Sequence, residues 1–211
     1  HQQEPLAFGT RPDDDRWTAF VAGTRMAFIS VQADEAEYYT KIESKQEQTK
    51  LAQGLPNVGD SSKSNKREAE TVARLIHTLC QLYSRSGIPF SPCKQIGIIV
   101  PFRAQIAMIR KALAERHIPD TADITIDTVE RYQGSQRDII IFSTTVSRPY
   151  QLSILSEPVM TDGREIDRKL NVALTRARKQ FFMTGNETLL RNCTAYRKFL
   201  DFLSKEQILR L

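Results

Sequence analysis

The chain has 211 residues, 40% of them hydrophobic and 26% charged, which is ordinary for a soluble globular protein and sufficient for one domain with an insertion. No apolar run approaches the roughly 20 residues needed to span a membrane, and no basic-then-apolar leader opens the chain. Neither a membrane partner nor secretion is therefore predicted. The three cysteines form no Cys-x-x-Cys pair and the three histidines lack metal-ligand spacing. We expect no disulfide framework, no metal site and a reducing cytoplasm.

The net charge of +5 is concentrated in the last quarter of the chain. Residues 161–211 hold 11 Lys and Arg against 6 Asp and Glu, whereas residues 1–160 hold 19 of each kind. A basic segment suits a polyanion such as a nucleotide or a nucleic acid. A solvated surface face would give the same composition.

The first 64 residues are mostly polar. The opening residues resemble neither a methionine start nor a leader, which predicts a piece of a longer protein. Residues 1–24 are rich in turn formers and are predicted to form a surface arm. An apolar strand is expected at residues 26–31. Residues 33–64 predict a polar insertion, with an exposed helix at about 34–53 and a loop after it. The domain is thus expected over residues 25–211.

The middle of the chain alternates between amphipathic helices and apolar strands. Asn65 is expected to cap a helix, with Glu68 as its partner three residues later. The predicted elements are a helix at 66–85, a strand at 96–100, a helix at 102–116, a short strand at 124–126 and a strong buried strand at 138–145.

After a loop at 148–163, the C-terminal part predicts a helix that opens near Arg164 and ends in the block from Leu170 to Arg178. A strand at 181–184 and helices at 187–191 and 194–209 follow. One apolar stripe at helical spacing defines the first of these helices, formed by Ile166, Leu170, Ala173, Leu174 and Ala177. Arg176 and Arg178 then project from opposite flanks of the stripe, if the helix stays regular. They could meet a phosphate from another domain, or be surface charges or salt-bridge partners.

Strands that are apolar throughout and alternate with helices predict an α/β fold, with a parallel sheet flanked by helices on both faces. Ligands of such sheets bind at the carboxyl ends of the strands. We therefore expect a site where three stretches meet at such ends, namely residues 101–103, 128–134 and 176–178.

Three blocks resemble, in order, motifs IV, V and VI of the second RecA-like motor domain of superfamily 1 helicases. They run from Ile98 to Gln105, from Thr128 to Asp138 and from Leu170 to Arg178. The most similar branch is the 5′-to-3′ one, which contains the nonsense-mediated-decay RNA helicase and the Dna-two-type helicases. The resemblance covers about residues 25–205 except 33–64, and it implies a RecA-like fold of the P-loop NTPase type.

The resemblance also implies roles for single residues. Arg176 is expected to be the arginine finger that reaches the γ-phosphate, and Arg178 to anchor its helix. Expected nucleotide contacts are Gln133, Gly134, Gln136, Arg178 and Arg103; expected nucleic-acid contacts are Thr128, Gln105 and Phe102. Other readings stay open: Phe102 and Tyr132 could be core residues, Arg103 a solvated helix start, and Thr128 an ordinary strand-end hydroxyl.

Two residues depart from the family pattern. Gln136 stands where the family usually has glutamate, so its amide can bind a nucleotide but supplies no charge. Glu130 stands where aspartate is more frequent.

No glycine in the chain is followed by lysine, so the phosphate loop is absent. The resemblance therefore implies half of a motor. ATP and Mg²⁺ would be held mainly by the first RecA-like domain of the parent protein, single-stranded DNA or RNA would be the track, and this fragment alone would show negligible ATPase. The alternatives are a single-strand-binding module that uses no ATP and, because of residues 33–64, an interaction scaffold.

Overall fold

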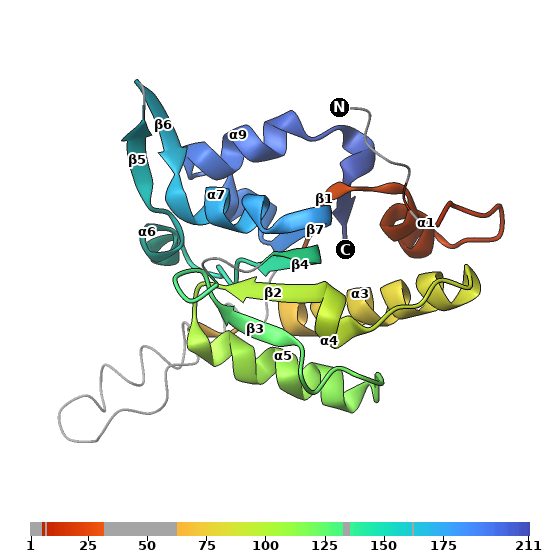
Figure 1. Ribbon diagram of the computed structural model, residues 1–211. Helices are drawn as coiled ribbons and strands as arrows, with labels where there is room; N and C mark the ends of the chain where they lie inside the picture. The colour runs from red at the N-terminus through yellow and green to blue at the C-terminus, as the bar shows by residue number, and fades with distance from the viewer. Residues whose placement is uncertain (1–5, 7, 32–62, 133–135, 162) are drawn as a thin grey trace, which may run out of the picture.

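The computed structural model describes residues 6, 8–31, 63–132, 136–161 and 163–211 (Figure 1). Its centre is a six-stranded parallel sheet with the strand order β3-β2-β4-β7-β1-β8. The strands of this sheet are β1 (Met26–Ser30), β2 (Ile96–Val100), β3 (Thr125–Thr128), β4 (Arg137–Ser143), β7 (Ala177–Gly185) and β8 (Ile208–Arg210). The predicted α/β class with a parallel sheet is confirmed.

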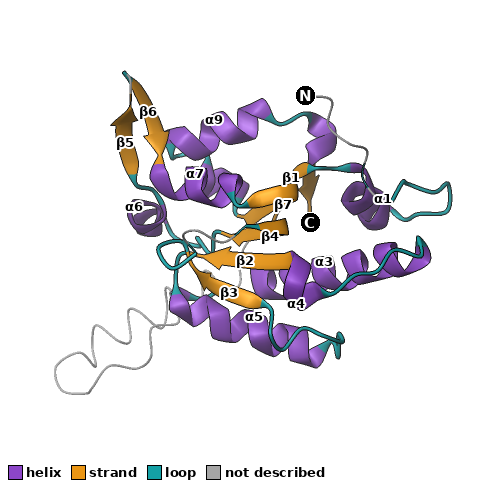
Figure 2. Cartoon of the chain, viewed as in Figure 1, coloured by secondary structure: helices purple, strands orange, loops and turns teal. Residues whose placement is uncertain are grey.

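Helices cover both faces of the sheet (Figure 2). The described α-helices are α1 (Arg16–Gly23), α3 (Lys66–Arg85), α4 (Pro92–Gln95), α5 (Arg103–Glu115), α6 (Leu152–Leu155), α7 (Arg168–Thr175), α8 (Glu187–Leu190) and α9 (Thr194–Phe202). Two 3₁₀ turns are η2 (Pro149–Gln151) and η3 (Lys205–Gln207). Helices α3 and α5 lie on one face, and α7 and α9 lie on the other (Figure 1).

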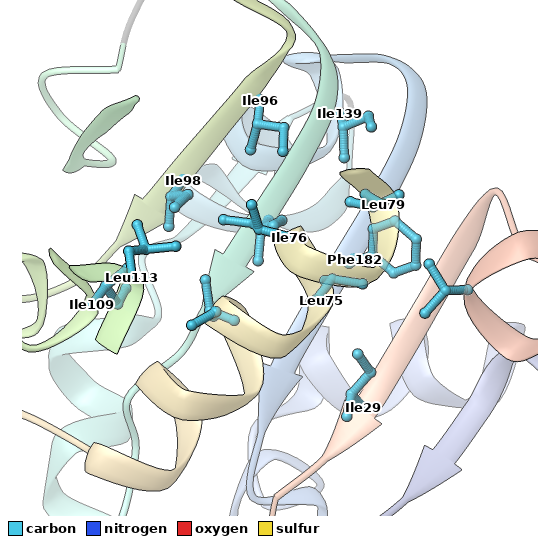
Figure 3. Close-up of a cluster of buried hydrophobic side chains, with 14 of the residues drawn as sticks. Ile29, Leu75, Ile76, Leu79, Ile96, Ile98, Ile109, Leu113, Ile139 and Phe182 are labelled. Atoms are coloured by element: carbon cyan, nitrogen blue, oxygen red, sulfur yellow. The ribbon is translucent and has the colours of Figure 1, made fainter. Parts of the chain in front are cut away.

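Alternating side chains of each strand build the two halves of the core. Ile98 and Ile139 point to the side of α3 and α5, as Figure 3 shows, whereas Ile99 and Ile140 point to the side of α7 and α9. All four are fully buried. Because both faces are covered, the central strands are apolar throughout, which explains why the strands β1, β2 and β4 were predicted.

The N-terminal segment is not a surface arm, so that prediction is wrong for its described residues. Trp17 and Val21 of α1 are buried, and the Trp17 indole donates to the Thr78 hydroxyl of α3 at 2.8 Å. Arg85 at the end of α3 pairs with Asp14. The apolar side of α1 covers the part of α3 that would otherwise face solvent. Residues 33–62 of the predicted insertion lie outside the described residues.

The helix predicted from Arg164 is shorter than expected. Residues 158–167 form a separate antiparallel hairpin of β5 (Pro158–Thr161) and β6 (Arg164–Asp167), and α7 begins only at Arg168. The Asp167 carboxylate sets this start, because it accepts from the Leu170 N–H at 2.8 Å as an N-cap. Ala177 already belongs to β7, so the predicted stripe was part strand and part helix.

The helix predicted to reach residue 209 ends at Phe202. The chain then turns and adds β8 to the outer side of β1, where Phe28 pairs with Ile208. This pairing satisfies backbone groups of β1 that the end of the sheet would leave without partners.

Candidate nucleotide and nucleic-acid edges

The structure divides the predicted site residues between two opposite edges of the sheet. Thr128, Phe102 and Arg103 lie at or just after the carboxyl ends of β3 and β2. Arg176 directly precedes β7, whose first residue, Ala177, pairs with Arg137 at the start of β4. Arg176 and its neighbours therefore lie at the amino edge, which corrects the prediction of one site at the carboxyl ends.

Arg176 is held in place by its backbone. Its N–H donates to the Ala173 carbonyl at 3.3 Å and closes α7, while its own carbonyl accepts from the Arg137 N–H at 3.0 Å. The side chain is partly buried, and its Nε atom is buried without a hydrogen-bond partner among the described residues. The backbone thus fixes the base of the side chain, and because the residue as a whole is only partly buried, its guanidinium can still bind an anion.

Arg178 and Gln136 lie beside Arg176 at the same edge. The Arg178 Nε donates to the Gln136 Oε1 at 3.4 Å, and the Gln136 Nε2 donates to the Thr175 carbonyl at 3.5 Å. Gln136 thus joins the start of β4 to the end of α7. Arg178 contacts Gln136 from the strand β7, whereas the sequence predicted that it would anchor a helix.

A groove of about 740 Å³ opens next to Arg178 at the amino edge. Arg25 and Lys179 give it positive charge, and Phe202, which is 77% exposed, lies in its wall. Lys179 is paired with Asp138 at 2.9 Å. The amino edge is therefore basic and partly apolar around Arg178.

The segment of motif V connects the two edges. It leaves the carboxyl end of β3 at Thr128, whose carbonyl accepts from the Tyr132 N–H at 2.9 Å, and it reaches the amino end of β4 at Arg137. Tyr132 is buried against Gly97 of β2, where an added Cβ would lie 1.8 Å from the Tyr132 Oη. Tyr132 is therefore a core residue. The predicted nucleotide contacts Gln133 and Gly134 lie outside the described residues.

The carboxyl edge contains the predicted nucleic-acid contacts, but not all of them are accessible. Arg103 is exposed at the first turn of α5, far from the nucleotide group with which it was predicted. Thr128 and Phe102 are 8% and 6% exposed. Gln105 is fully buried, and its Nε2 donates to the Asn65 carbonyl and the Ser143 hydroxyl. Its predicted contact with nucleic acid is therefore corrected to an internal structural role.

Glu68 is a buried acid that the sequence assigned only to a helix cap. Its Oε2 accepts from the Ser143 hydroxyl at 2.8 Å, the Thr184 hydroxyl at 2.9 Å and the Thr145 N–H at 3.1 Å. Its Oε1 accepts from the Asn65 Nδ2 at 3.3 Å, so the capping pair does form. Burial raises the pKa of Glu68 to about 7, although these hydrogen bonds favour the charged form.

A sequence signal for Glu68 was present but was not used. Glu68 stands four and seven residues before Val72 and Leu75, and all three are fully buried on α3. An acid in register with an apolar stripe indicates a buried carboxylate with dedicated donors.

The described residues contain no group of three or more His, Cys, Asp or Glu side chains that could hold a metal ion. No helix within them is long and apolar enough to cross a membrane.

Comparison with known proteins places the chain in a family. Residues 14–188 match the family model of an AAA domain. The MOV-10 protein of Gallus gallus, named as a helicase, is 32% identical over 155 residues, which is 67% of this chain and 15% of that protein. The DNA replication ATP-dependent helicase/nuclease DNA2 of Bos taurus is 31% identical over 139 residues, 65% of this chain and 12% of that protein.

A third relative is the DNA polymerase alpha-associated DNA helicase A of Saccharomyces cerevisiae, which is 34% identical over 103 residues, 48% of this chain and 14% of that protein. The chain spans only a small fraction of the length of each of these relatives. Together with the parallel sheet and the order of the motifs, the match identifies the domain. The chain belongs to the AAA domain family that forms the C-terminal RecA-like part of superfamily 1 helicases of the MOV-10 and DNA2 type.

Proposed function

We propose that this chain is the second motor domain of an ATP-dependent helicase, and that Arg176 is its arginine finger. The observation that carries the proposal is the state of Arg176, whose backbone is fixed at the end of α7 while its Nε lacks a partner among the described residues. A planar guanidinium in this position can stabilise the charge that develops on a transferring phosphoryl group.

The neighbours of Arg176 support a nucleotide at the amino edge. Gln136 and Arg178 offer an amide and a second guanidinium at the junction of β4 and α7. The sequence has no Gly-Lys pair and hence no phosphate loop, so the main ligands of ATP and Mg²⁺ would come from the first motor domain. In that arrangement the nucleotide is bound between two domains, and this chain contributes the groups that sense its phosphates.

The nucleic-acid track would run along the carboxyl edge. There Arg103 supplies an exposed positive charge, and Thr128 and Phe102 lie beside it, largely buried, at the strand ends. An exposed positive charge of this kind can bind the phosphate backbone of a single strand of DNA or RNA. A reducing, cytoplasmic location is part of the proposal, because the three scattered cysteines form no Cys-x-x-Cys pair.

The test uses the full-length protein that carries this chain, with the variants Arg176→Ala and, as a matched control, Arg197→Ala. Arg197 is an arginine of α9 that is exposed, whereas Arg176 is partly buried. We expect Arg176→Ala to lower strand-stimulated ATPase by roughly 10³-fold or more and to leave single-strand affinity within about twofold. Arg197→Ala should change neither.

Two results would contradict the proposal. Equal loss of ATPase and strand binding in Arg176→Ala would remove the finger role. A full-length protein that binds single strands but hydrolyses no ATP would favour the binding-module alternative. The isolated 211-residue chain is expected to show negligible ATPase.

A further inference from the structure

The hydrogen bonds of Glu68 meet at the ends of the two strands that carry the nucleotide group. Strands β4 and β7 begin at the amino edge with Arg137 and Ala177, next to Arg176. At the carboxyl ends of these strands, Ser143 of β4 pairs with Thr184 of β7. The hydroxyl groups of both residues donate to the same oxygen of Glu68. Glu68 therefore joins the carboxyl ends of the same strand pair whose amino ends hold the predicted finger.

The same group of hydrogen bonds continues to the candidate nucleic-acid edge. Ser143 accepts from the Gln105 Nε2 at 3.2 Å, and Gln105 lies in the first turn of α5, where its N–H donates to the Phe102 carbonyl at 3.1 Å. Gln105 also exchanges two hydrogen bonds with the backbone of Asn65, at 2.7 and 3.0 Å. A side-chain path thus runs from β7 through Glu68, Ser143 and Gln105 to the start of α5.

The carboxylate is suited to this position because its donors converge. Three donors face one oxygen of Glu68. A charged carboxylate oxygen can accept all three hydrogen bonds, whereas the oxygen of an amide or of a protonated acid is a weaker acceptor. The Thr145 donor is held in a left-handed conformation, with φ of +63°, that brings its N–H to the acid. The groups that donate to Glu68 come from β4, β7, the turn after β4 and the cap residue Asn65, and all of them are neutral.

We propose that Glu68 is the positioning residue that couples the nucleotide edge to the nucleic-acid edge of this domain. Its carboxylate holds the ends of β4 and β7 together and, through Ser143 and Gln105, sets the start of α5. A shift of β7 that follows phosphate binding at Arg176 is thereby passed to Phe102 and Arg103. This inference rests on the proposed function, because it assumes a nucleotide at one edge and a single strand at the other.

The experiment measures coupling in the full-length protein. The dissociation constant of a fluorescent single-stranded oligonucleotide is determined with and without a non-hydrolysable ATP analogue, for wild type, Glu68→Gln and the control Glu70→Gln. Glu70 lies on the same helix but is exposed, and within the described part of the chain it pairs with Lys66. The coupling is expressed as the larger of the two dissociation constants divided by the smaller. We expect this ratio to fall at least about fivefold towards one in Glu68→Gln. The ATPase activity without a strand should stay within about twofold of wild type. Glu70→Gln should behave as wild type.

A pH profile separates this role from a merely structural one. If the charged carboxylate carries the coupling, the wild-type ratio should fall towards the Glu68→Gln value between pH 8 and pH 6, and the variant ratio should stay flat. Ser143→Ala, which removes the link to Gln105, should lower the ratio as well, and it provides the test should Glu68→Gln fail to fold.

A Glu68→Gln or Ser143→Ala protein that folds and keeps the wild-type ratio at pH 8 would overturn the coupling role. A wild-type ratio that does not change between pH 8 and pH 6 would also overturn it. The proposed function is judged separately by Arg176→Ala, which abolishes turnover if the finger role holds, whatever the Glu68 variants do.

Discussion

Replacing Glu68 by Gln should change how the stability of the domain depends on pH. Burial raises the pKa of Glu68 from its ordinary value of 4.5 to about 7. Because the raised value belongs to the folded state, the folded chain binds more protons than the unfolded chain between these two values. The contribution of Glu68 to stability is therefore greatest below pH 4.5, declines as the pH rises, and is lost above about pH 7.

The size of this effect follows from the two pKa values. Each pKa unit corresponds to 1.36 kcal/mol, so the interval from 4.5 to about 7 gives a decline of about 3 kcal/mol. Glutamine does not titrate, so Glu68→Gln removes this pH dependence of the free energy of unfolding. Any change in stability that the substitution causes equally at all pH values does not affect this result. Other acids also contribute to the pH dependence. Asp14 is one example, because Arg85 lowers the pKa of its carboxyl group to about 2. The informative quantity is thus the difference between wild type and variant.

The measurement is urea unfolding of the 211-residue chain at intervals between pH 4.5 and pH 8. The free energy of unfolding of the wild type, minus that of Glu68→Gln, should fall by about 3 kcal/mol over this range. The same difference for Glu70→Gln should stay nearly constant, because Glu70 is exposed and makes only a surface pair with Lys66. A flat difference for Glu68→Gln, or one that rises with pH, would refute the burial argument.

Two further predictions concern residues that position the motifs. Gly97→Ala should destabilise the domain by about 1–3 kcal/mol because its Cβ would overlap the Tyr132 hydroxyl. Tyr132→Phe removes a buried hydroxyl without a partner among the described residues and should be nearly neutral on its own. In a thermal-unfolding double-mutant cycle, Tyr132→Phe should relieve part of the destabilisation caused by Gly97→Ala. Full additivity of the two changes would contradict the contact. Asp167→Ala should cost about 1–2 kcal/mol, since the carboxylate caps α7 and also accepts from Ser156 and Glu157; a change below about 0.5 kcal/mol in urea unfolding would show that the start of α7 does not depend on this cap.

The sheet was predictable because its strands are apolar on both faces. The strands at Ile96–Val100 and Arg137–Ser143 read as continuous apolar runs, and α3 read as an amphipathic helix with an Asn65 cap. Local patterns of this kind are decided within a few residues, so tertiary structure did not override them.

The hairpin and the N-terminal helix were missed for the opposite reason. Ile166 fits the helical spacing of the apolar residues that follow it, and the pairing of residues 158–161 with 164–167 depends on a turn that includes Gly163. The apolar residues of α1 are few, and only their contacts with α3 show that Trp17 is buried. In both cases the deciding interactions lie outside the local sequence pattern.

The placement of Arg176 shows what a motif can and cannot predict. The residue type and its position at a helix end followed from the sequence, but its edge of the sheet did not follow from the rule that ligands bind at carboxyl ends. An arginine that directly precedes a parallel strand lies at the amino edge, and under the proposed function it would meet the first motor domain there. The order of helix and strand along the chain was therefore a better guide than the general rule.

The two edges are also linked covalently, and the length of that link restricts their movement. Eight residues separate Thr128 at the end of β3 from Arg137 at the start of β4, fewer than the dozen or more that usually connect parallel strands. The turn that joins Tyr132 to Thr128 uses four of them at the carboxyl edge. Tyr132 is buried against Gly97 of β2. The described end of the connection is therefore held to the neighbouring strand, so that the first half of motif V keeps a fixed position relative to β2 and β3.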